Sequence, residues 1–551
     1  MEFKKACLPG GDIREFEEGA SIFEILGCKK DIDEPFIAIL DGEEVEDLSK
    51  KIHYDVNIKP LRMKDDLGAS AYLRTLIFVF VKAVKNLYPD AKVILKNSFS
   101  RGLYGEIENI EGISEEKVKS IKEKMNEIIE SDLEIEKIKF KKSEAVKIFE
   151  DNGMEDKLQG LKYIDLPYIS LYKCGEFYDY FYGVMLISTG YLKIYDLFKN
   201  GEGFILMSPR KGSNFTLPEF KDSPNLVKIF EETQRVSDIV GVSNIGDLND
   251  KVISKGINDI ILVSESLHEK KIGLIADKIF SCKEKIKLVM VAGPSSSGKT
   301  TFSKRLSIQL RLLGLKPYII SLEDYSIDRR YIPVDEEGKY NFEAIEAYDI
   351  ELLNEHIKSL LDGEEVNIPR FDFIKGSRVE EDRKYKMKDN TILIVEGMHA
   401  LNKVLVESVQ RENKFKIYVS ALTQLNIDNH NIIEPKDVRR CRRLIKDNKV
   451  KGVNPEEVLS IWSNVDKVET ESVFPYQEEA DAMFNSTVMY EMSILRKYVE
   501  PLLESVSKES PSYIEARRLL DIILCFKEAE EKFIPQNSII KEFIGKSCFE
   551  D

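Results

Sequence analysis

A phosphate-loop pattern in the middle of this chain of 551 residues constrains its fold more than any other feature. Residues 287–292 form a short, mostly apolar segment, as expected of a strand that is buried on both faces. Residues 293–300, GPSSSGKT, fit the pattern GxxxxGK(S/T) at every position. Apolar residues then recur at helical spacing as far as Leu313, and Gly314 ends the run. The pattern therefore predicts a strand, a phosphate loop and a helix in direct succession.

The chemistry of phosphate binding needs each part of this loop. Glycines let backbone amides approach phosphate oxygens, and the N-terminus of the following helix favours their negative charge. Lys299 would reach the β and γ phosphates, and the hydroxyl of Thr300 can ligate magnesium. The expected nucleotide-binding residues are Gly293, Pro294, Ser295, Ser296, Ser297, Gly298, Lys299, Thr300 and Thr301.

Charge, cysteine usage and length limit the class of protein. With 81 Lys and Arg against 97 Asp and Glu, the net charge of −16 argues against a nucleic-acid coat or an anionic membrane as the general partner. The seven cysteines are scattered without a CxxC pair, which predicts reduced thiols. No apolar run approaches the ~18 residues of a membrane span, and the N-terminus lacks a signal-peptide core. We therefore expect a cytoplasmic protein of about three or four domains.

Two further strands in the second half end in carboxylates. Residues 317–322 read as a buried strand that runs into Glu323 and Asp324, and residues 391–395 as an apolar strand that ends in Glu396. In an open parallel sheet the carboxyl ends of the strands face the ligand crevice. Glu323 or Asp324 could then take the proton from an attacking hydroxyl, unless the pair forms only a solvated acidic turn. Glu396 is expected to hold magnesium, directly or through water.

A basic segment, VRRCRRLIKDNKVK, follows at residues 438–451 of this otherwise acidic chain. Such a run ordinarily forms the solvated face of a helix. Because it comes one domain's length after the phosphate loop, we favour a lid over the phosphates. Its guanidinium groups would spread the developing negative charge.

The motifs spread over residues 286–500 are GPSSSGKTT, SLEDYSIDR, YNFEAIEAYD, IPRFDF, ILIVEGMHAL, RRLIKD and FPYQEEADAMFN. Together they resemble the uridine kinase and phosphoribulokinase family of P-loop kinases. The resemblance implies magnesium-dependent transfer of the γ-phosphate of ATP, or alternatively GTP, to the 5′-hydroxyl of a nucleoside. It gives Lys299, Thr300 and Glu396 the phosphate and magnesium positions, and it makes Arg443 a lid arginine.

The chain departs from the family pattern at the base. Uridine kinases usually carry an Asp three residues into SxDxxY, where this chain has Glu323 followed directly by Asp324. One extra methylene moves the carboxylate by ~1.5 Å, and a misplacement of about 1 Å can cost about a hundredfold in rate. Either Asp324 serves as the base, or the loop adjusts, or the reaction is slow.

The acceptor-binding positions that the resemblance implies are Phe342, Glu343, Phe371, Asp372, Lys446 and Lys451. Glu343 stands where an Asp holds the ribose hydroxyls, and Phe371 and Gly376 replace a tyrosine and a histidine that help to read the pyrimidine. Lys446 and Lys451 stand where lid arginines are usual, so the bidentate fork is lost. The acceptor could therefore be another alcohol, as in phosphoribulokinase.

The front of the chain resembles part of another enzyme. IREFEEGASIFEIL and FIAILDGEEVEDLSKKI resemble the TGS domain, the β-grasp unit of threonyl-tRNA synthetases, and NSFSRGLYGEI and YKCGEFYDYFYGVMLISTGYLK resemble their editing domain. That family binds metal through two histidines and a Cys and His, but the matching Arg74, Phe78, Phe181 and Met185 supply no imidazole or thiolate. We expect the fold without the metal, in a region that binds RNA, binds a small ligand, or serves packing and dimerisation.

The expected fold class is a multidomain α/β and α+β protein whose P-loop kinase has a parallel sheet flanked by helices. The expected domains are residues 1–61 (TGS-like β-grasp), 62–207 (editing-like, without metal ligands), 208–285 (connector with helices), 286–505 (kinase-like) and 506–551 (C-terminal helices). Residues 480–506 and 512–533 read as amphipathic helical stretches, and residues 539–544 as an apolar end that docks on a neighbour. No chemistry is expected there.

Two classes of function fit these patterns. The first is an ATP-dependent nucleoside kinase with a small-molecule acceptor. The second is a nucleotide-switched RNA- or protein-binding protein with little kinase activity. A homo-oligomer is compatible with both.

Overall fold

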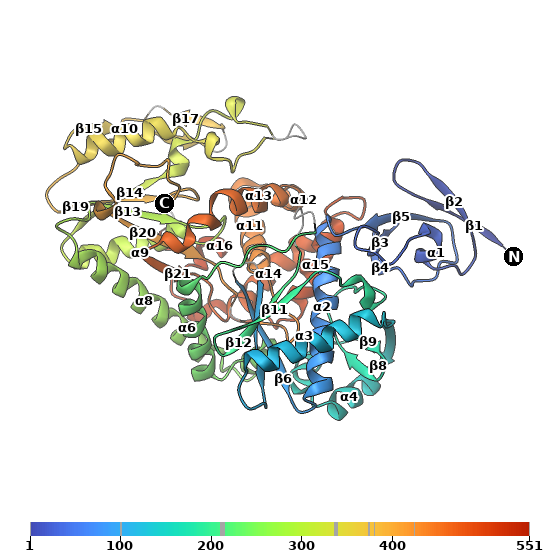
Figure 1. Cartoon of the computed structure of the whole chain (residues 1–551). Coiled ribbons are helices and arrows are strands. Elements are labelled where there is room, and N and C mark those ends of the chain that lie inside the picture. Colours follow the sequence, from blue (N-terminus) through green and yellow to red (C-terminus); the bar gives the residue numbers. More distant parts are fainter. Residues whose placement is uncertain are drawn as a thin grey trace.

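A computed structural model describes the chain except for residues 1, 100–101, 210–214, 335–339, 373–374, 380, 424 and 550–551. The end of the IPRFDF motif, part of the NSFSRGLYGEI block and part of the connector lie outside the described residues. The chain forms a β-grasp module, an α+β region around one long helix, and an α/β region with a parallel sheet (Figure 1). The β-grasp module, in dark blue, and the parallel sheet lie at opposite ends of the molecule. The predicted fold class is confirmed.

The β-grasp module is a five-stranded mixed sheet in the order β2-β1-β5-β3-β4 around a short helix. Its elements are β1 (Phe3–Cys7), β2 (Ile13–Glu17), α1 (Ile22–Leu26), β3 (Ile37–Leu40), β4 (Glu44–Asp47) and β5 (Val56–Leu61). β1 and β5 are parallel, and the other neighbours are antiparallel. Ser21 and Glu24 form a capping box that starts α1, and Gly27 ends it in the left-handed conformation.

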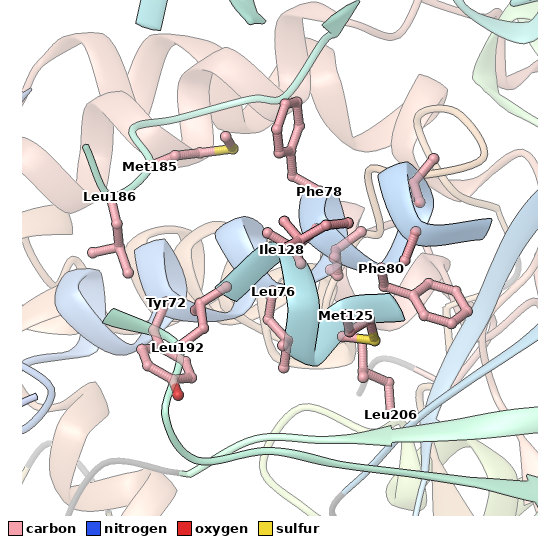
Figure 2. Close-up of a cluster of buried hydrophobic side chains, with 14 of the residues drawn as sticks. Tyr72, Leu76, Phe78, Phe80, Met125, Ile128, Met185, Leu186, Leu192 and Leu206 are labelled. Atoms are coloured by element: carbon pink, nitrogen blue, oxygen red, sulfur yellow. The ribbon is translucent and has the colours of Figure 1, made fainter. Parts of the chain in front are cut away.

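The second region is built around α2 (Asp66–Leu87), which is buried along most of its length. Two antiparallel sheets, in the orders β11-β12-β7-β6 and β10-β9-β8, pack around it. Figure 2 shows Leu76 and Phe80 of α2 in one apolar core with Met125 and Ile128 of α3. The surrounding elements are β6 (Lys92–Phe99), β7 (Gly102–Glu108), α3 (Glu115–Glu130), β8 (Glu136–Lys141), α4 (Lys142–Asp151), α5 (Glu155–Leu161), β9 (Tyr168–Cys174), β10 (Phe177–Asp179), β11 (Asp196–Asn200) and β12 (Gly203–Met207).

Among the described residues, α2 is the one helix long and apolar enough to cross a membrane by length and composition. In this structure 72% of its most apolar window is buried inside the protein. The apolar character of α2 is therefore explained by its place at the centre of the core.

The C-terminal region has a five-stranded parallel sheet in the order β14-β19-β13-β20-β21. Its strands are β13 (Leu288–Ala292), β14 (Lys316–Ser321), β19 (Thr391–Glu396), β20 (Lys414–Ser420) and β21 (Ala482–Asn485). Alternate residues of β13 face opposite sides of the sheet: Leu288 and Met290 join one buried cluster, and Val289 and Val291 the other. Helix α9 (Lys299–Leu312) contributes Phe302 to the second cluster. Both faces are thus buried, as the apolar runs predict.

Helices complete the C-terminal half and connect it to the front. They are α6 (Pro224–Val240), α7 (Ile245–Ile253), α8 (Ile257–Ser281), α10 (Ile350–Leu361), α11 (Pro435–Lys451), α12 (Pro455–Ser460), α13 (Trp462–Ser472), α14 (Glu491–Glu504), α15 (Tyr513–Leu524) and α16 (Lys541–Ile544). Two short antiparallel strand pairs lie beside the sheet: β15 (Glu365–Asn367) with β18 (Lys384–Lys386), and, between them in the chain, the hairpin of β16 (Arg370–Asp372) and β17 (Ser377–Val379). All seven cysteines are free.

The prediction of one helical stretch over residues 480–506 was wrong at its start. Residues 482–485 form β21, which pairs with β20 in parallel from Ile417 to Ser420. The carboxylate of Asp481 accepts from the backbone N–H of Lys416 at 2.8 Å and fixes the register where the strand begins. A long-range pairing partner therefore decides the conformation of a short apolar run that also fits a helix.

Candidate active site

The phosphate loop joins β13 to α9 in a backbone shape that needs its glycines. At Gly293 a Cβ atom would lie 1.9 Å from the backbone oxygen of Val419, so only glycine fits beside β20. Gly298 caps α9 with a φ of 83°, in the left-handed region that glycine adopts without strain. The loop therefore delivers its amides to the N-terminus of a 14-residue helix, where anions bind.

Lys299, Thr300 and Glu396 lie together at the carboxyl ends of β13 and β19. Lys299 Nζ reaches back across the loop and donates to the backbone oxygen of Pro294 at 3.0 Å. Thr300 Oγ1 donates to Glu396 Oε1 at 3.3 Å. A hydroxyl and a carboxylate in contact are the oxygen donors that Mg²⁺ prefers, and phosphate sites complete its shell with water and substrate oxygens. Thr300 and Glu396 therefore fit a magnesium ion.

The charges around this pair are strongly coupled. The pKa of Glu396 is raised to about 7, first by burial and then by the charge of Glu323, while Lys299 opposes both. Burial lowers the pKa of Lys299, and Glu396 and Glu323 work against it. Glu323 thus lies within electrostatic reach of both Lys299 and Glu396.

The two carboxylates after β14 have different neighbours. Glu323 is exposed, and its charge acts on Lys299 and Glu396. Asp324 Oδ2 pairs with Arg383 Nη1 at 3.1 Å, and Asp324 Oδ1 accepts from the backbone N–H of Phe371 at 3.4 Å. The charge of Glu323 therefore acts on Lys299 and Glu396, whereas Asp324 is bound to Arg383 and to the backbone of β16.

The basic segment forms α11, which lies against the phosphate loop and is not a solvated helix. Arg443 Nη1 donates to Ser295 Oγ at 3.1 Å and to Glu343 Oε1 at 2.7 Å. Arg439 and Arg442 each donate to a backbone oxygen of the loop at 3.2 Å. The helix that the sequence predicts to be a lid is therefore packed on the phosphate loop.

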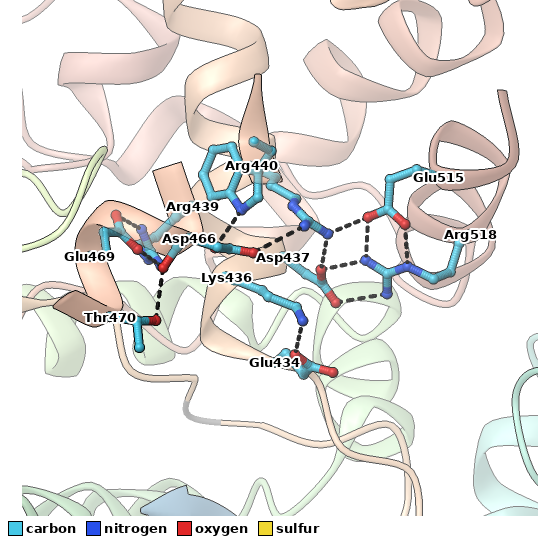
Figure 3. A network of polar contacts seen from close by, with 11 residues as sticks. Glu434, Lys436, Asp437, Arg439, Arg440, Asp466, Glu469, Thr470, Glu515 and Arg518 are labelled. Carbon is cyan, nitrogen blue, oxygen red and sulfur yellow. Dashed lines mark hydrogen bonds and ion pairs between the residues drawn. The ribbon is translucent and has the colours of Figure 1, made fainter. Parts of the chain in front are cut away.

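Several lid arginines are bound by carboxylates at the base of the lid, as Figure 3 shows. Arg439 pairs with Glu469 of α13 through two hydrogen bonds of 2.6 and 2.8 Å, and both side chains are buried. Arg440 contacts Asp437 and Glu515, and Arg518 of α15 joins the same network. These arginines hold α11 on its neighbours. Because carboxylates neutralise their positive charge, fewer cationic groups of the segment can contact phosphates than its composition suggests.

Two carboxylates that sequence reasoning missed contact the phosphate loop itself. Ser295 N donates to Glu469 Oε1 at 2.8 Å. Thr301 donates to Glu542 Oε2 through its backbone N–H at 3.2 Å and its hydroxyl at 2.7 Å, and Lys446 Nζ binds Glu542 Oε1 at 2.9 Å. Burial acts to raise the pKa of Glu542, but Lys446 and Thr301 outweigh it and hold the pKa near about 2.

The remaining acceptor positions lie further apart. Phe342 is 44% exposed, with Arg329 over its ring, and Phe371 is buried. Asp372 pairs with Lys375 at 3.7 Å, and Lys451 pairs with Asp447 at 3.1 Å. The structure therefore brings Glu343 to the lid and the phosphate loop through Arg443, and Lys446 to the loop through Glu542. It leaves Lys451 at the far end of the lid helix.

The positions that would bind metal in the α+β region form an apolar core. The Phe78 ring meets the rings of Phe177 and Phe181 at centroid distances of 5.0 and 6.2 Å. Met185 is 1% exposed and lies near Phe78 in Figure 2. Arg74 Nε donates to the backbone oxygen of Val184 at 3.0 Å, and burial lowers its pKa to about 10. No group of three or more metal-ligating side chains occurs in the part of the chain that the structure describes.

Residues 425–434, the segment between β20 and the lid helix, pack against this same region. Asn426 Nδ2 donates to the backbone oxygen of Leu95, and Leu95 N donates to the backbone oxygen of Asn429, both at 2.9 Å. The His430 ring stacks on Phe181, and its Nδ1 lies 2.7 Å from Asp179 Oδ2. A segment of the kinase half therefore lies at the position where the editing-like region would carry its metal.

The parallel sheet, the glycine-shaped phosphate loop and the Thr300–Glu396 pair of the C-terminal half are features typical of a P-loop kinase fold. Residues 288–493 match the model of the Phosphoribulokinase / Uridine kinase family. Among solved structures, a possible uridine kinase from Bacillus stearothermophilus is 20% identical, with a TM-score of 0.26 over 38% of this chain and 97% of that chain. D-glycerate 3-kinase from Cryptococcus neoformans is 13% identical, with a TM-score of 0.23 over 46% of this chain and 87% of that chain.

The N-terminal region is similar to a different class of enzyme. Threonine–tRNA ligase of Acetivibrio thermocellus is 33% identical over 200 residues, which are 35% of this chain and 31% of that protein. Threonine–tRNA ligase of Thermotoga neapolitana is 30% identical over 244 residues, or 42% and 37% of the two chains. The chain thus spans about a third of the length of the curated relatives it matches. The resemblance to both families is confirmed, each for its own part of the chain.

Proposed function

We propose that this protein is a magnesium-dependent kinase that transfers the γ-phosphate of ATP, or alternatively GTP, to the 5′-hydroxyl of a nucleoside. The observation that carries the proposal is the contact of Thr300 with Glu396 beside Lys299, in a domain that matches a kinase family. Phosphoryl transfer depends on positioning and charge stabilisation, and these residues supply both.

Each residue has a role that its surroundings support. Lys299 binds the β and γ phosphates, and Arg443 stabilises charge from the lid. Thr300 and Glu396 would hold Mg²⁺, which would neutralise part of the charge of the phosphates. Glu323 is the base, because its partner in sequence is held in an ion pair with Arg383.

A product assay with purified protein, Mg²⁺, ATP or GTP, and a panel of nucleosides and sugar phosphates tests the proposal. Phosphorylation of a nucleoside is the expected result. If only another alcohol were phosphorylated, the protein would still be a kinase, but its acceptor would not be a nucleoside. Absence of any product, despite measurable ATP binding, would contradict the kinase.

A matched pair of variants assigns the base. Glu323→Gln should lower kcat by about a hundredfold or more, because it removes the proton acceptor. Asp324→Asn should lower kcat by less than about tenfold, because it weakens a partly exposed ion pair. The reverse order of effects would make Asp324 the base.

A second function, a nucleotide-switched binding protein, is favoured by the segment of residues 425–434. This segment leads directly into α11 and is hydrogen-bonded to the synthetase-like region. Lid movement on nucleotide binding would therefore pull on the front half. Filter binding with tRNA, with and without ATP, tests this function: retention that depends on ATP supports it, and equal retention in both states contradicts it.

A further inference from the structure

The two carboxylates on the phosphate loop are held in different ways. Glu469 is fixed inside the kinase domain, because its bidentate partner Arg439 and its own side chain are only 4% and 0% exposed. Glu542 lies outside the span that matches the kinase family, on the four-residue helix α16. Its partner Lys446 has a side chain that is 36% exposed. Of the two carboxylates, Glu542 is the one that can leave without breaking a buried pair.

The contacts of Glu542 are those that a phosphate group would make. Its carboxylate accepts from the backbone N–H and the hydroxyl of Thr301 at the start of α9, and it binds the ammonium of Lys446. Amides at a helix N-terminus together with a cationic side chain form an anion site. A nucleotide phosphate and Glu542 therefore compete for the same donors.

Neighbouring residues close the site around this carboxylate. A Cβ at Gly298 would lie 2.6 Å from Ile539 Cγ2, so the segment rests directly on the turn into α9. The Phe543 ring lies 4.9 Å from the Arg442 guanidinium, and Lys449 Nζ donates to the backbone oxygen of Ile544 at 2.9 Å. We name residues 538–545 the C-terminal plug, because they cover the start of α9 and are tied to the lid helix.

We propose that the C-terminal plug is autoinhibitory and that Glu542 occupies the place of a nucleotide phosphate. This inference rests on the proposed function, since it needs the loop to bind nucleotide. Nucleotide binding exchanges the carboxylate of Glu542 for a phosphate and releases Lys446 from its ion pair. The released ammonium then faces the phosphate chain, where the sequence comparison places a lid cation.

The decisive experiment measures the affinity for a non-hydrolysable ATP analogue by calorimetry in the full-length chain. Glu542→Gln keeps the size of the side chain and removes the competing charge, so we expect the analogue to bind about tenfold more tightly than to the native chain. Glu530→Gln is the matched control, because Glu530 is an exposed carboxylate of the same C-terminal region. Its affinity should equal that of the native chain.

Hydrogen exchange of the plug amides, measured in the native chain with and without the analogue, tests the same proposal without any substitution. The amides of Glu542 and Phe543 donate to the backbone oxygens of Ile539 and Ile540. They should exchange faster when the analogue is bound, because Glu542 no longer anchors this turn to Thr301 and Lys446. Weaker binding by Glu542→Gln, or slower exchange of these amides, would make the plug part of the nucleotide pocket and overturn autoinhibition.

The two proposals fail in different ways. Equal affinity of the native chain and Glu542→Gln, with unchanged exchange of the plug, overturns the inference and leaves the kinase standing. Absence of analogue binding in both folded proteins overturns the kinase, and the inference with it.

Discussion

The synthetase-like region and the kinase domain both fill a ligand site with side chains of this chain, but they fill it with opposite chemistry. In the first, Phe78, Phe181 and Met185 pack where metal ligands would stand. In the second, Glu542 accepts from an amide at the start of α9 that would receive phosphate. An apolar core has nothing to exchange with a ligand, whereas a carboxylate on an amide can be replaced by another anion. The metal position around Phe78 is closed by apolar packing. The phosphate site is closed by the Glu542 carboxylate, which competes with a phosphate for the same donors.

The largest effect should come from Lys299→Ala, which tests whether the phosphate loop is still a working site. We expect turnover to fall by about a thousandfold, because the lysine stabilises charge in the transition state. The thermal unfolding midpoint should stay unchanged, and steady-state kinetics with thermal melts will measure both. Lys316→Ala, at an exposed lysine of β14, is the control and should keep full turnover. If Lys299→Ala turned over as fast as the native chain, the phosphate loop would not be a working site. It would then be inactive in the same way as the metal position around Phe78.

Phe78→Ala tests the opposite side of the comparison. Phe78 is fully buried, so its truncation should cost about 3–5 kcal/mol in the free energy of opening of α2. Native-state hydrogen exchange of α2 amides measures this quantity. Leu87→Ala, at a residue 38% exposed near the end of the same helix, should cost less than about 1 kcal/mol. If both substitutions cost the same, Phe78 does not serve packing. ATP affinity should not change in either variant.

Acid should weaken the junction of the two halves before it affects either core. The pKa of Asp179 is lowered to about 2: burial acts to raise it, but His430 and Lys157 outweigh burial. A carboxyl with a lowered pKa stabilises the folded state above its unfolded value near 3.8, and this contribution is lost as pH falls towards 2. The contribution is on the order of 2 kcal/mol.

Urea unfolding of the native chain and of Asp179→Asn between pH 7 and pH 2 will measure that contribution. The variant should be less stable at pH 7, because it leaves Lys157 without one of its carboxylates. The two stability curves should approach each other as pH falls from about 4 to about 2. A difference that stays constant over the whole range would show that the ion cluster does not hold the junction.

The smallest effect is expected at the outer end of the lid. Lys451 pairs with Asp447 and its side chain is 40% exposed, so Lys451→Ala should change KM by less than about threefold. Lys446→Ala, the comparison variant, removes the cation that faces the loop and should raise KM for ATP by about tenfold or more. Equal effects would give Lys451 the substrate contact that the family resemblance implies.

Much of the fold could be predicted from local sequence pattern, and each element that was missed or wrongly predicted has an identifiable physical cause. The phosphate loop and α9 could be predicted because glycine spacing and helical periodicity are contained in one short stretch. The strands β2 and β4 were not predicted, because their alternate residues are exposed and charged, as in IREFE. β21 was read as helix because its partner β20 lies far away in the sequence.

The same holds for the candidate site: residues within local motifs could be predicted, and residues brought in by long-range packing could not. Lys299, Thr300 and Glu396 stand in motifs, and the structure brings them together. Glu542 stands in no motif, and it reaches Thr301 across 241 residues. Contacts of that kind depend on how the C-terminal segment packs on the phosphate loop. This packing cannot be predicted from periodicity or motif spacing in the sequence.

The hydrogen bonds of residues 425–434 bear on how this protein can be divided. The side chain of Asn426 donates to the backbone oxygen of Leu95, and the backbone oxygen of Asn429 accepts from Leu95 N. Asn431 Oδ1 accepts from the backbone N–H of Tyr182. A fragment that begins at residue 286 would keep every motif of the kinase and lose all of these partners. Transplanting either half into another protein would therefore remove part of the other half's framework, so the two should be expressed as one piece.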